Sequence, residues 1–489
     1  MNELKTIVVR GFFWMFFAGL IVNLIQFFSK IILARILSPQ EFGVVSIAIS
    51  IVSFAGFFYD LGLGSALVQR KAKVEEKEEF ESFNSTYFFS FSIGSLIAIL
   101  LFLFSKNIAV QFNSIELETV IKIISITLPL GALTIPQIAY LSKNLLFFKK
   151  FIAETIPILL GSLSSLILAY YNWGYLSLVT GYVVGSVAYA VLLLFLSPWK
   201  PKFYFDLRTL IELISYGKFI LIGNITAMVL AQGDNFVVGK ISGVAQLGYY
   251  SIAYTLATLP SVNLAHIVSR VVFPTFAKLQ DSKEELKIGF LKTISLISFI
   301  ILPIGIGTII VSPFIFSVII SEKWLPAHTS LIILSFLGIF KSLQVVPSFF
   351  LQATGSSKKD AKIMSLSMLV EIFLLFPLTY KFGIVGAALA VTISYAYSLI
   401  NYFLECSKYL SVSFVSCIKT LLPAIIGSIL MFFTGTLSIN LLKNSYTFFN
   451  LLIVLSVCVL SYIITLFFIN KKLFVELYNL ALSFFNRNQ

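Results

Sequence analysis

Polar and ionisable side chains recur at helical spacing inside long apolar stretches of this 489-residue sequence. Asn23, Gln26 and Lys30, for example, stand at i, i+3 and i+7, so they share one face of a helix. The other rows are Asn224, Thr226, Gln232, Asp234 and Asn235; Asn263, His266 and Arg270; and Lys341, Gln344, Ser348 and Gln352. Ionisable groups are costly inside a membrane, so they normally face a bundle interior or a water-filled cavity. The rows therefore predict a shared polar cavity at membrane depth.

Each basic residue of these rows also has a purely structural interpretation. Lys30, Arg270 and Lys341 could extend to the membrane surface or pair with carboxylates, which would hold helices together. The candidate carboxylates are Asp60, Asp234 and Glu371. For a single residue both interpretations stay open, whereas four aligned rows favour a shared cavity. His266 alone is expected to be hydrogen-bonded within its helix rather than to relay protons.

No catalytic or metal-binding motif accompanies the polar rows. The sequence has no nucleophile elbow, Walker loop or D-x-D motif in a soluble segment. Its two histidines are 62 positions apart, and Cys406, Cys417 and Cys458 form no C-x-x-C pair. The Gly-rich phrase that begins at Asp60 follows a lipid-length helix, so it indicates a helix end and not a nucleotide-binding turn. We therefore expect no enzyme, no metal, no cofactor and three thiols packed within helices.

The composition places most of the chain in a membrane. Hydrophobic residues make up 58% of the sequence, charged residues 12%, and the mean hydropathy is +0.97. Soluble domains carry roughly 25% charged residues. The net charge of +13 falls in short gaps between apolar blocks, which argues against a nucleic-acid partner. The 50 Phe and 21 Tyr are expected mostly to face lipid or to anchor the membrane interfaces.

Apolar blocks of the roughly 20 residues that cross a bilayer predict an all-α polytopic membrane protein with about 14 transmembrane helices. The spans lie near 12–34, 42–64, 83–104, 115–140, 151–171, 174–196, 216–239, 246–273, 290–312, 328–352, 362–380, 384–405, 416–438 and 448–470. The first is too long for a signal peptide, so we expect it to be retained. The phrase Ser38-Pro39-Gln40-Glu41 predicts a helix start with a capping box. Prolines within spans predict bends at Pro129, Pro136, Pro303 and Pro347.

Lys and Arg alternate between two sets of loops. One set carries clusters, including those at 70–77, 143–150, 200–208, 278–287 and 358–362. The other set carries single basic residues, namely Arg35, Lys106, Lys240, Lys323, Lys381 and Lys443. By the positive-inside rule the first set and both termini are cytoplasmic. No outer connection is long, which argues against an enzyme with an external catalytic loop.

Two alignments within the sequence indicate an internal repeat. Residues 236–253 align without gaps on 31–48, so that Lys240 matches Arg35. The further matches are Gly248 with Gly43 and residues 381–394 with 172–185. Six spans are thus duplicated in the same orientation, as in parallel-repeat transporters that bind substrate between two bundles. The predicted domains are a six-helix bundle (1–196), a cytoplasmic connector (197–215), a second six-helix bundle (216–405) and two further helices with a short cytoplasmic tail (406–489).

Two stretches carry a family resemblance. Residues 32–71, which begin ILARILSPQEFGVVS, resemble the opening signature of the polysaccharide-exporter (Wzx-like) branch of the multidrug/oligosaccharidyl-lipid/polysaccharide flippase superfamily. Residues 232–260, which begin QGDNFVVGKISG, are similar to the second signature of that branch. The resemblance implies two six-helix bundles in a V, two extra C-terminal helices, and movement of undecaprenyl-diphosphate-linked oligosaccharide to the outer leaflet. It also implies a multi-pass protein of the inner membrane, with a polysaccharide polymerase and a chain-length regulator as further partners.

The resemblance gives the polar rows a role in binding a lipid-linked oligosaccharide. A cationic lining would receive the diphosphate, and its members are Lys30, Arg35, Lys240, Arg270 and Lys341. Amides would bind sugar hydroxyl groups, and these are Asn23, Gln26, Asn224, Asn235, Asn263 and Gln344. Asp60 and Asp234 are candidates for ion coupling or for pairing the cations. Alternating access would follow from rocking one repeat against the other.

Three alternatives stay open. A cation-driven multidrug exporter of the same superfamily would line its site with acidic and aromatic residues, whereas the charge within these spans is mainly basic. A membrane glycosyltransferase or polymerase would need a long catalytic loop outside the membrane. A lipid-II-type flippase is the third alternative.

Overall fold

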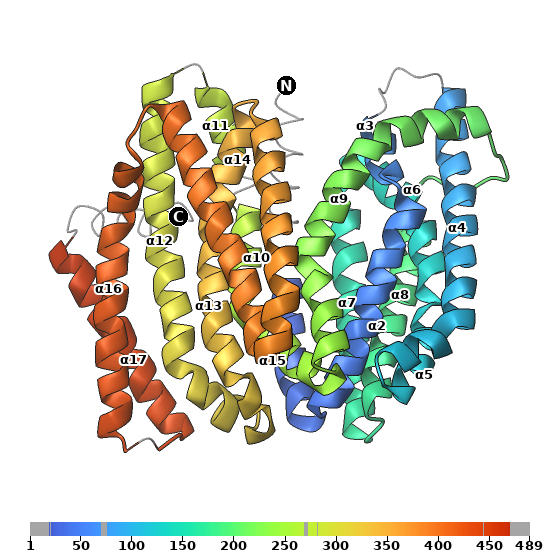
Figure 1. Cartoon of the computed structure of the whole chain (residues 1–489). Helices are drawn as coiled ribbons and strands as arrows, with labels where there is room; N and C mark the ends of the chain where they lie inside the picture. Colours follow the sequence, from blue (N-terminus) through green and yellow to red (C-terminus); the bar gives the residue numbers. More distant parts are fainter. Residues whose placement is uncertain are drawn as a thin grey trace, which may run out of the picture. The chain divides into compact units, whose positions relative to one another are not determined.

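The computed structural model describes residues 19, 21–69, 76–267, 272–280, 282–443 and 445–469, with the side chains of 76–77, 216–222 and 260–267 left aside. Within these ranges every regular element is a helix (Figure 1). A first helix covers residues 21–36. It is followed by α2 (Pro39–Asp60), α3 (Leu63–Gln69), α4 (Glu76–Gln111), α5 (Ile115–Ile124), α6 (Thr127–Lys143), α7 (Phe147–Tyr170), α8 (Tyr175–Leu196), α9 (Leu207–Ile241) and α10 (Val244–Ile267). The later helices are α11 (Phe273–Leu279), α12 (Lys283–Phe314), α13 (His328–Leu343), α14 (Val345–Ala353), α15 (Ser357–Leu410), α16 (Phe414–Leu441) and α17 (Phe448–Ile469). The all-α prediction is confirmed.

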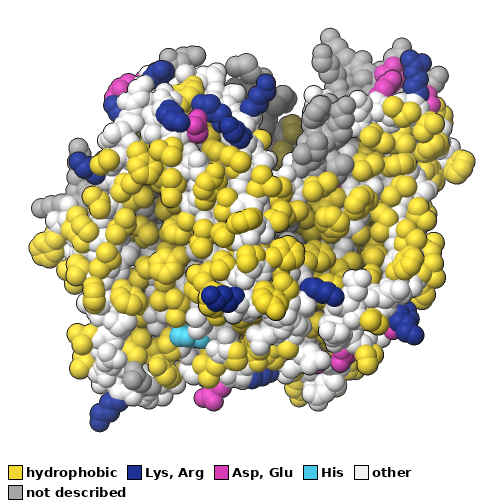
Figure 2. Space-filling view, viewed as in Figure 1, with side chains coloured by type: hydrophobic (Ala, Val, Ile, Leu, Met, Phe, Trp, Pro, Cys, Tyr) yellow, Lys and Arg dark blue, Asp and Glu magenta, His cyan; other side chains and the backbone are white. Residues whose placement is uncertain are grey.

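Among the described residues, 10 helical segments are long and apolar enough to cross a membrane. Both predicted C-terminal spans are among them, as α16 and α17. Figure 2 shows hydrophobic side chains over most of the visible face, with most charged side chains near its upper and lower edges. Large apolar side chains such as Phe195, Phe373 and Phe468 are exposed, as lipid-facing residues of a membrane protein are. The total of about 14 spans stays a prediction.

The start of α2 follows the predicted capping box. Ser38 Oγ accepts from the Glu41 backbone N–H, and Glu41 Oε2 accepts from the Ser38 backbone N–H at 2.6 Å. Pro39 occupies the first helical turn, where its missing N–H costs nothing. These contacts satisfy two of the N–H groups that a helix start leaves unpaired, so the chain turns tightly between two spans.

Two of the predicted proline bends coincide with breaks between helices. A proline cannot donate to the carbonyl four residues earlier, which weakens the helix at that point. The partner position of Pro129 is Ser125, and α5 ends at Ile124. The partner position of Pro347 is Leu343, where α13 ends. The break between α5 and α6 and the break between α13 and α14 thus share one cause.

The backbone supports the internal repeat at glycine positions. Gly174 and Gly383, which the sequence alignment pairs, adopt the same conformation, with φ 57° and ψ −138° at Gly174 and φ 58° and ψ −138° at Gly383. This conformation lies near a region that is open essentially only to glycine. Gly383 also divides α15 into two helices that correspond to the predicted spans near 362–380 and 384–405. The duplicated-bundle prediction is therefore supported by local geometry as well as by sequence.

A second pair of matched glycines lies where α2 crosses α10. A Cβ at Gly43 would collide with the carbonyl oxygen of Val244, and a Cβ at Gly248 would collide with the carbonyl oxygen of Pro39. The two contacts are reciprocal, because the alignment pairs Gly43 with Gly248 and Pro39 with Val244. Reciprocal contacts are typical of a two-fold relation between two helices.

We predict that Gly43→Ala lowers the stability of the purified protein by about 1–3 kcal/mol, the usual range for overpacking a close contact. The added methyl group would push α2 away from the first turn of α10. Gly307→Ala is the matched control, because the nearest atom to a Cβ there is Met431 Cε at 4.0 Å. Thermal unfolding in detergent measures both variants. Equal midpoints for Gly43→Ala and Gly307→Ala would contradict the prediction.

The chain forms two compact units, each with its own core. The first unit comprises Met1–Ile252 with Met368–Ala387, and the second comprises Ala253–Ser367 with Ala388–Gln489. In the first, Leu67, Phe83 and Leu213 belong to a buried cluster from α3, α4 and α9. In the second, Phe290, Phe350 and Tyr402 belong to a cluster that also buries two of the three free cysteines. The third cysteine, Cys458, is buried where α16 and α17 pack on α12. The domain boundaries predicted from sequence stay a prediction.

The segment between α8 and α9 is held along the start of α4. The backbone N–H of Lys202 donates to Asn84 Oδ1 at 2.6 Å, and that of Asp206 donates to Ser85 Oγ at 2.8 Å. Asp206 caps α9, and hydrogen bonds from the Thr209 hydroxyl and backbone N–H lower the pKa of its carboxyl. The connector therefore ends at Asp206, and residues 207–215 of the predicted connector are the first turns of α9.

Candidate functional site

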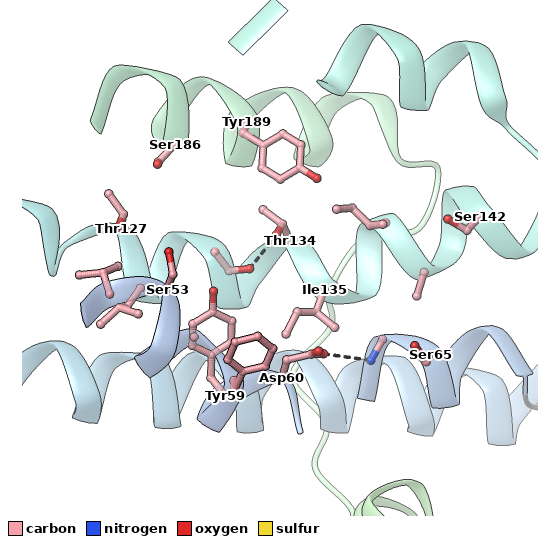
Figure 3. A pocket seen from close by; sticks show the side chains of 18 of the residues that line it. Ser53, Tyr59, Asp60, Ser65, Thr127, Thr134, Ile135, Ser142, Ser186 and Tyr189 are labelled. Carbon is pink, nitrogen blue, oxygen red and sulfur yellow. Dashed lines mark hydrogen bonds between the residues drawn. The ribbon is translucent and has the colours of Figure 1, made fainter. Parts of the chain in front are cut away.

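A cavity of about 930 Å³ with polar groups in its wall lies within the first unit. It is lined from α2, α3, α6 and α8 (Figure 3). Its polar lining residues are Ser53, Tyr59, Asp60, Ser65, Gln69, Thr127, Thr134, Ser142, Tyr182, Ser186 and Tyr189. Small-molecule sites occupy roughly 300–1,000 Å³, so this cavity is large enough for a ligand.

Asp60 reaches the cavity because α2 ends there. Leu61 and Gly62 adopt left-handed conformations, with φ of 46° and 76°, which stops the helix. The chain then starts α3, and Asp60 Oδ1 accepts from the Gly64 backbone N–H at 3.3 Å. The Gly-rich phrase after Asp60 is thus a helix end, as predicted, and it fixes a carboxylate in the cavity wall.

Tyr59 lines the cavity beside Asp60, and a glycine makes room for it. A Cβ at Gly131 of α6 would lie 2.5 Å from the Tyr59 hydroxyl oxygen. A methyl group at this position would displace the Tyr59 hydroxyl, so the glycine leaves the room that the hydroxyl occupies.

The α8 wall presents Tyr182, Ser186 and Tyr189, which stand at i, i+4 and i+7. Ser186 Oγ donates to the Tyr182 carbonyl oxygen at 2.9 Å. On α6, Thr134 Oγ1 donates to the Gly131 carbonyl oxygen at 2.6 Å, and Thr127 Oγ1 donates to that of Ile124 at 2.7 Å. The Ser186 and Thr134 hydroxyl hydrogens are donated within their own helices, so these two groups offer a ligand their oxygen lone pairs. Thr127 instead donates to the last residue of α5 and hydrogen-bonds with the Tyr182 side chain. Figure 3 shows Thr127 and Thr134 between the Asp60 side and the Tyr189 side.

The predicted polar patch of the seventh span forms a second cluster in the first unit. Asp234, which is 1% exposed, accepts from the Tyr250 hydroxyl at 2.6 Å. Asn235 Nδ2 donates to Ser50 Oγ at 3.1 Å and to Gln232 Oε1 at 2.5 Å. The cluster joins α2, α9 and α10 through buried polar contacts. These contacts can hold the three helices together, and the role of the cluster in binding stays a prediction.

Lys341 is the centre of a cluster in the second unit. Its ammonium group lies 5.5 Å from the ring centroids of both Tyr254 and Tyr395, and Nζ donates to the Tyr254 hydroxyl at 3.3 Å. Aromatic faces attract a cation, which lowers the cost of holding it at membrane depth. One turn along, Gln344 Oε1 accepts from Ser398 Oγ at 2.8 Å. Lys341 thus presents a positive charge within the unit.

The Ser348–Gln352 end of the same predicted row has another role. Asp360, which is 7% exposed, accepts from Ser348 Oγ at 2.8 Å, from Gln352 Nε2 at 2.9 Å and from the Tyr402 hydroxyl at 2.5 Å. Ser348 and Gln352 therefore join α14 to α15. Of this row, Lys341 and Gln344 are the members that lie apart from the Asp360 network.

The remaining predicted site residues differ in exposure. Asn23 and Asn224 are half-buried, and the exposed ones are Gln26, Lys30, Arg35 and Lys240. Lys240 Nζ donates to the Gln111 carbonyl oxygen at 2.6 Å, where a cation is favoured by the C-terminal end of α4. Asn263 and His266 lie on α10 among the side chains left aside, and Arg270 lies outside the described residues.

The sequence interpretation missed the tyrosines of the cavity. Tyrosines are expected mostly to face lipid or the interfaces, and Tyr59, Tyr182 and Tyr189 are exceptions, because all three line the cavity. The spacing of Tyr182, Ser186 and Tyr189 is the signal that could have identified one wall. Tyr59 gave no such signal, because its position depends on Gly131 of another helix.

Long apolar helices, polar groups within the spans and a cavity with polar groups in its wall are features of a polytopic membrane transporter. Comparison with known proteins agrees with this class. The chain belongs to the family described as polysaccharide biosynthesis protein, whose family model matches residues 32–329, more than half of its length. It is 25% identical over 430 residues to the lipopolysaccharide biosynthesis protein WzxC of Escherichia coli (strain K12), covering 86% of this chain and 85% of that protein. It is 26% identical over 410 residues to the teichuronic acid biosynthesis protein TuaB of Bacillus subtilis (strain 168), covering 81% and 80% of the two chains.

The solved structure of the lipid II flippase MurJ in an inward closed conformation has a similar fold. It matches with a TM-score of 0.79 at 18% identity, covering 95% of this chain and 99% of that one. The fold that the sequence resemblance to the flippase superfamily predicts is therefore confirmed.

Proposed function

We propose that this protein is a flippase that moves undecaprenyl-diphosphate-linked oligosaccharide repeat units across the cytoplasmic membrane for surface polysaccharide biosynthesis. The observation that carries the proposal is the family match over residues 32–329. WzxC and TuaB, by their names, serve the biosynthesis of lipopolysaccharide and of teichuronic acid, which are both surface polysaccharides. The protein acts as a transporter and not as an enzyme.

In this proposal the basic residues bind the diphosphate. Lys341 supplies a charge that two tyrosine rings hold within the second unit. Lys30, Arg35, Lys240 and Arg270 are the further proposed cations. The proposed amide ligands of the sugars are Asn23, Gln26, Asn224, Asn235, Asn263 and Gln344. Asp234 is proposed for charge pairing, and transport follows alternating access.

The proposed location is the inner, cytoplasmic membrane with both termini in the cytoplasm, as the basic loop clusters indicate. Lipid-linked repeat units and membrane lipids are then the immediate partners. A polysaccharide polymerase and its chain-length regulator would consume the repeat units on the outer leaflet.

Deleting the gene tests the proposal. The deletion strain is expected to lose its surface polysaccharide and to accumulate lipid-linked repeat units, because synthesis continues without translocation. A plasmid copy of the gene should restore the polymer and clear the accumulated lipid. Normal surface polysaccharide in the deletion strain would disprove the function.

A second candidate is a multidrug exporter, and the Asp60 cavity is the observation that favours it. A carboxylate among tyrosines is the lining expected for an organic cation. Growth of the deletion strain on ethidium separates the two functions. Increased sensitivity to ethidium with an unaltered surface polysaccharide would favour the exporter.

A further inference from the structure

We propose that the Asp60 cavity of the first unit is a glycan subsite, which binds sugar rings of the repeat unit and excludes its diphosphate. The inference rests on the proposed function. It assigns the glycan of the substrate to this cavity, whereas the diphosphate is assigned to the basic residues. It is carried by the cavity's size, its carboxylate and hydroxyl groups and its aromatic walls.

The described lining has one carboxylate and contains no Lys, Arg or His. Lys150, which is not among the lining residues, donates to Ser142 Oγ at 3.3 Å and pairs with Glu154 at 3.9 Å, so its charge is balanced at that point. A diphosphate in such a cavity would meet a like charge at Asp60 and no cation in the described lining. The cavity therefore suits a ligand without negative charge.

The hydrogen-bonding groups suit a ligand with several donors. Ser186 and Thr134 each donate their hydroxyl hydrogen to a backbone carbonyl, which leaves their oxygen lone pairs to accept from a ligand. Asp60 accepts a hydrogen bond from the Gly64 N–H. An ionised carboxylate has about four acceptor sites, so Asp60 can accept further hydrogen bonds from a ligand. Sugar hydroxyl groups are donors as well as acceptors, so several can be satisfied at once in this cavity.

The tyrosines supply the apolar part of the recognition. Tyr59, Tyr182 and Tyr189 each combine a flat apolar ring with a hydroxyl group. A sugar ring is likewise amphipathic, with C–H groups on its faces and hydroxyl groups at its edge. Rings along the wall can cover the C–H faces while the acceptors bind the edges. The cavity volume of about 930 Å³ lies near the upper end of the range for small-molecule sites, roughly 300–1,000 Å³, so the cavity is large enough for a sugar ring.

Binding to the protein in nanodiscs tests the subsite with two probes, namely undecaprenyl diphosphate and the same lipid carrying a repeat unit extracted from the source cells. Asp60→Asn should weaken binding of the glycan-bearing lipid about tenfold, because a charge-assisted hydrogen bond is replaced by a neutral one. Tyr189→Phe should weaken it about fivefold through loss of one hydroxyl group. Binding of the sugar-free lipid should stay within about twofold of the wild-type value for both variants. Tyr189→Phe keeps the aromatic ring, so a loss of binding in this variant does not come from misfolding. The matched control is Tyr170→Phe, since Tyr170 is exposed on α7 and does not line the cavity.

Each other outcome overturns the subsite. If the wild-type protein binds the glycan-bearing lipid more tightly but neither variant changes that preference, the proposed function stands and the subsite is wrong. If Asp60→Asn weakens both lipids equally, Asp60 acts on the transport cycle and not on the glycan. If the wild-type protein binds ethidium in an Asp60-dependent way and has no preference for the glycan-bearing lipid, the function and the subsite both fail.

Discussion

Replacing Lys341 by methionine is expected to reduce translocation of repeat units at least about tenfold, with an unchanged amount of protein in the membrane. The side chain is half-buried in the second unit, where its ammonium lies 5.5 Å from the centroids of Tyr254 and Tyr395. A hydrogen bond to a charged group contributes about 1.5–3 kcal/mol, which corresponds to roughly 10–150-fold in affinity. Methionine keeps the length and the apolar stem, so the packing between the two rings is retained.

Two further variants separate ligand binding from a structural role of Lys341. Lys341→Arg keeps the charge and the contact with the rings, so it should retain most of the activity. Lys408→Met is the control, because Lys408 is 69% exposed in a surface ion pair with Glu405 and such pairs contribute little. The assay follows accumulation of untranslocated lipid-linked units in cells that carry each variant. Full transport by Lys341→Met, or an equal loss in Lys341→Arg, would show that the charge does not bind substrate.

Much of the helical framework follows from local features of the sequence. Apolar blocks of membrane length predict α8 and α17 almost to the residue, because crossing a bilayer needs about 20 apolar residues in a helix. The capping box at Ser38 is equally local, since its partners lie within four positions. The repeat was predictable because Gly174 and Gly383 must both be glycine to adopt their shared conformation. Such features need no knowledge of the tertiary structure.

The cavity could not be predicted in the same way, because it depends on which helices meet. Tyr59, Thr134 and Tyr189 lie on three helices and come together only through packing. The sequence offered Lys30, Arg270 or Lys341 as partners of the Asp60 carboxylate, but it did not indicate the tyrosines that line the cavity with it. Asn235, a proposed sugar ligand, donates its amide to Ser50 and Gln232, and its spacing in the sequence did not predict these contacts. A polar residue in a span can face a ligand or another helix, and spacing alone does not distinguish these cases.

Asp360 in the second unit is another residue whose contacts the sequence does not predict. The sequence predicts a span from 362 onward and treats Lys358 and Lys359 as loop residues, but α15 already begins at Ser357. Asp360 therefore lies in a first helical turn, where a negative charge is favoured by the helix dipole. Its three hydrogen-bond donors come from α14 and from the far end of α15, at positions 12, 8 and 42 residues away.

Asp360→Leu is expected to destabilise the second unit by about 3–5 kcal/mol, the largest effect on stability that we predict. The leucine would leave Ser348 Oγ, Gln352 Nε2 and the Tyr402 hydroxyl without their acceptor in a site where the residue is 7% exposed. Each buried donor left without a partner costs about 1–3 kcal/mol. Asp360→Asn keeps an acceptor oxygen, so it should cost distinctly less. Thermal unfolding in detergent gives the size of the loss, and hydrogen exchange should locate it in α14 and α15.

A double-mutant cycle with Tyr402→Phe shows whether the loss comes from the hydrogen-bond network. Tyr402→Phe removes the donor at 2.5 Å and should cost about 1–2 kcal/mol alone. In the Asp360→Leu background it should cost little, because the hydroxyl then has no acceptor to lose. Glu284→Gln is the control, since Glu284 is 71% exposed in its pair with Lys287. Additive losses of stability in the cycle would mean that leucine destabilises the unit through its shape. An unchanged thermal unfolding midpoint for Asp360→Leu would mean that α14 and α15 are held by apolar packing alone.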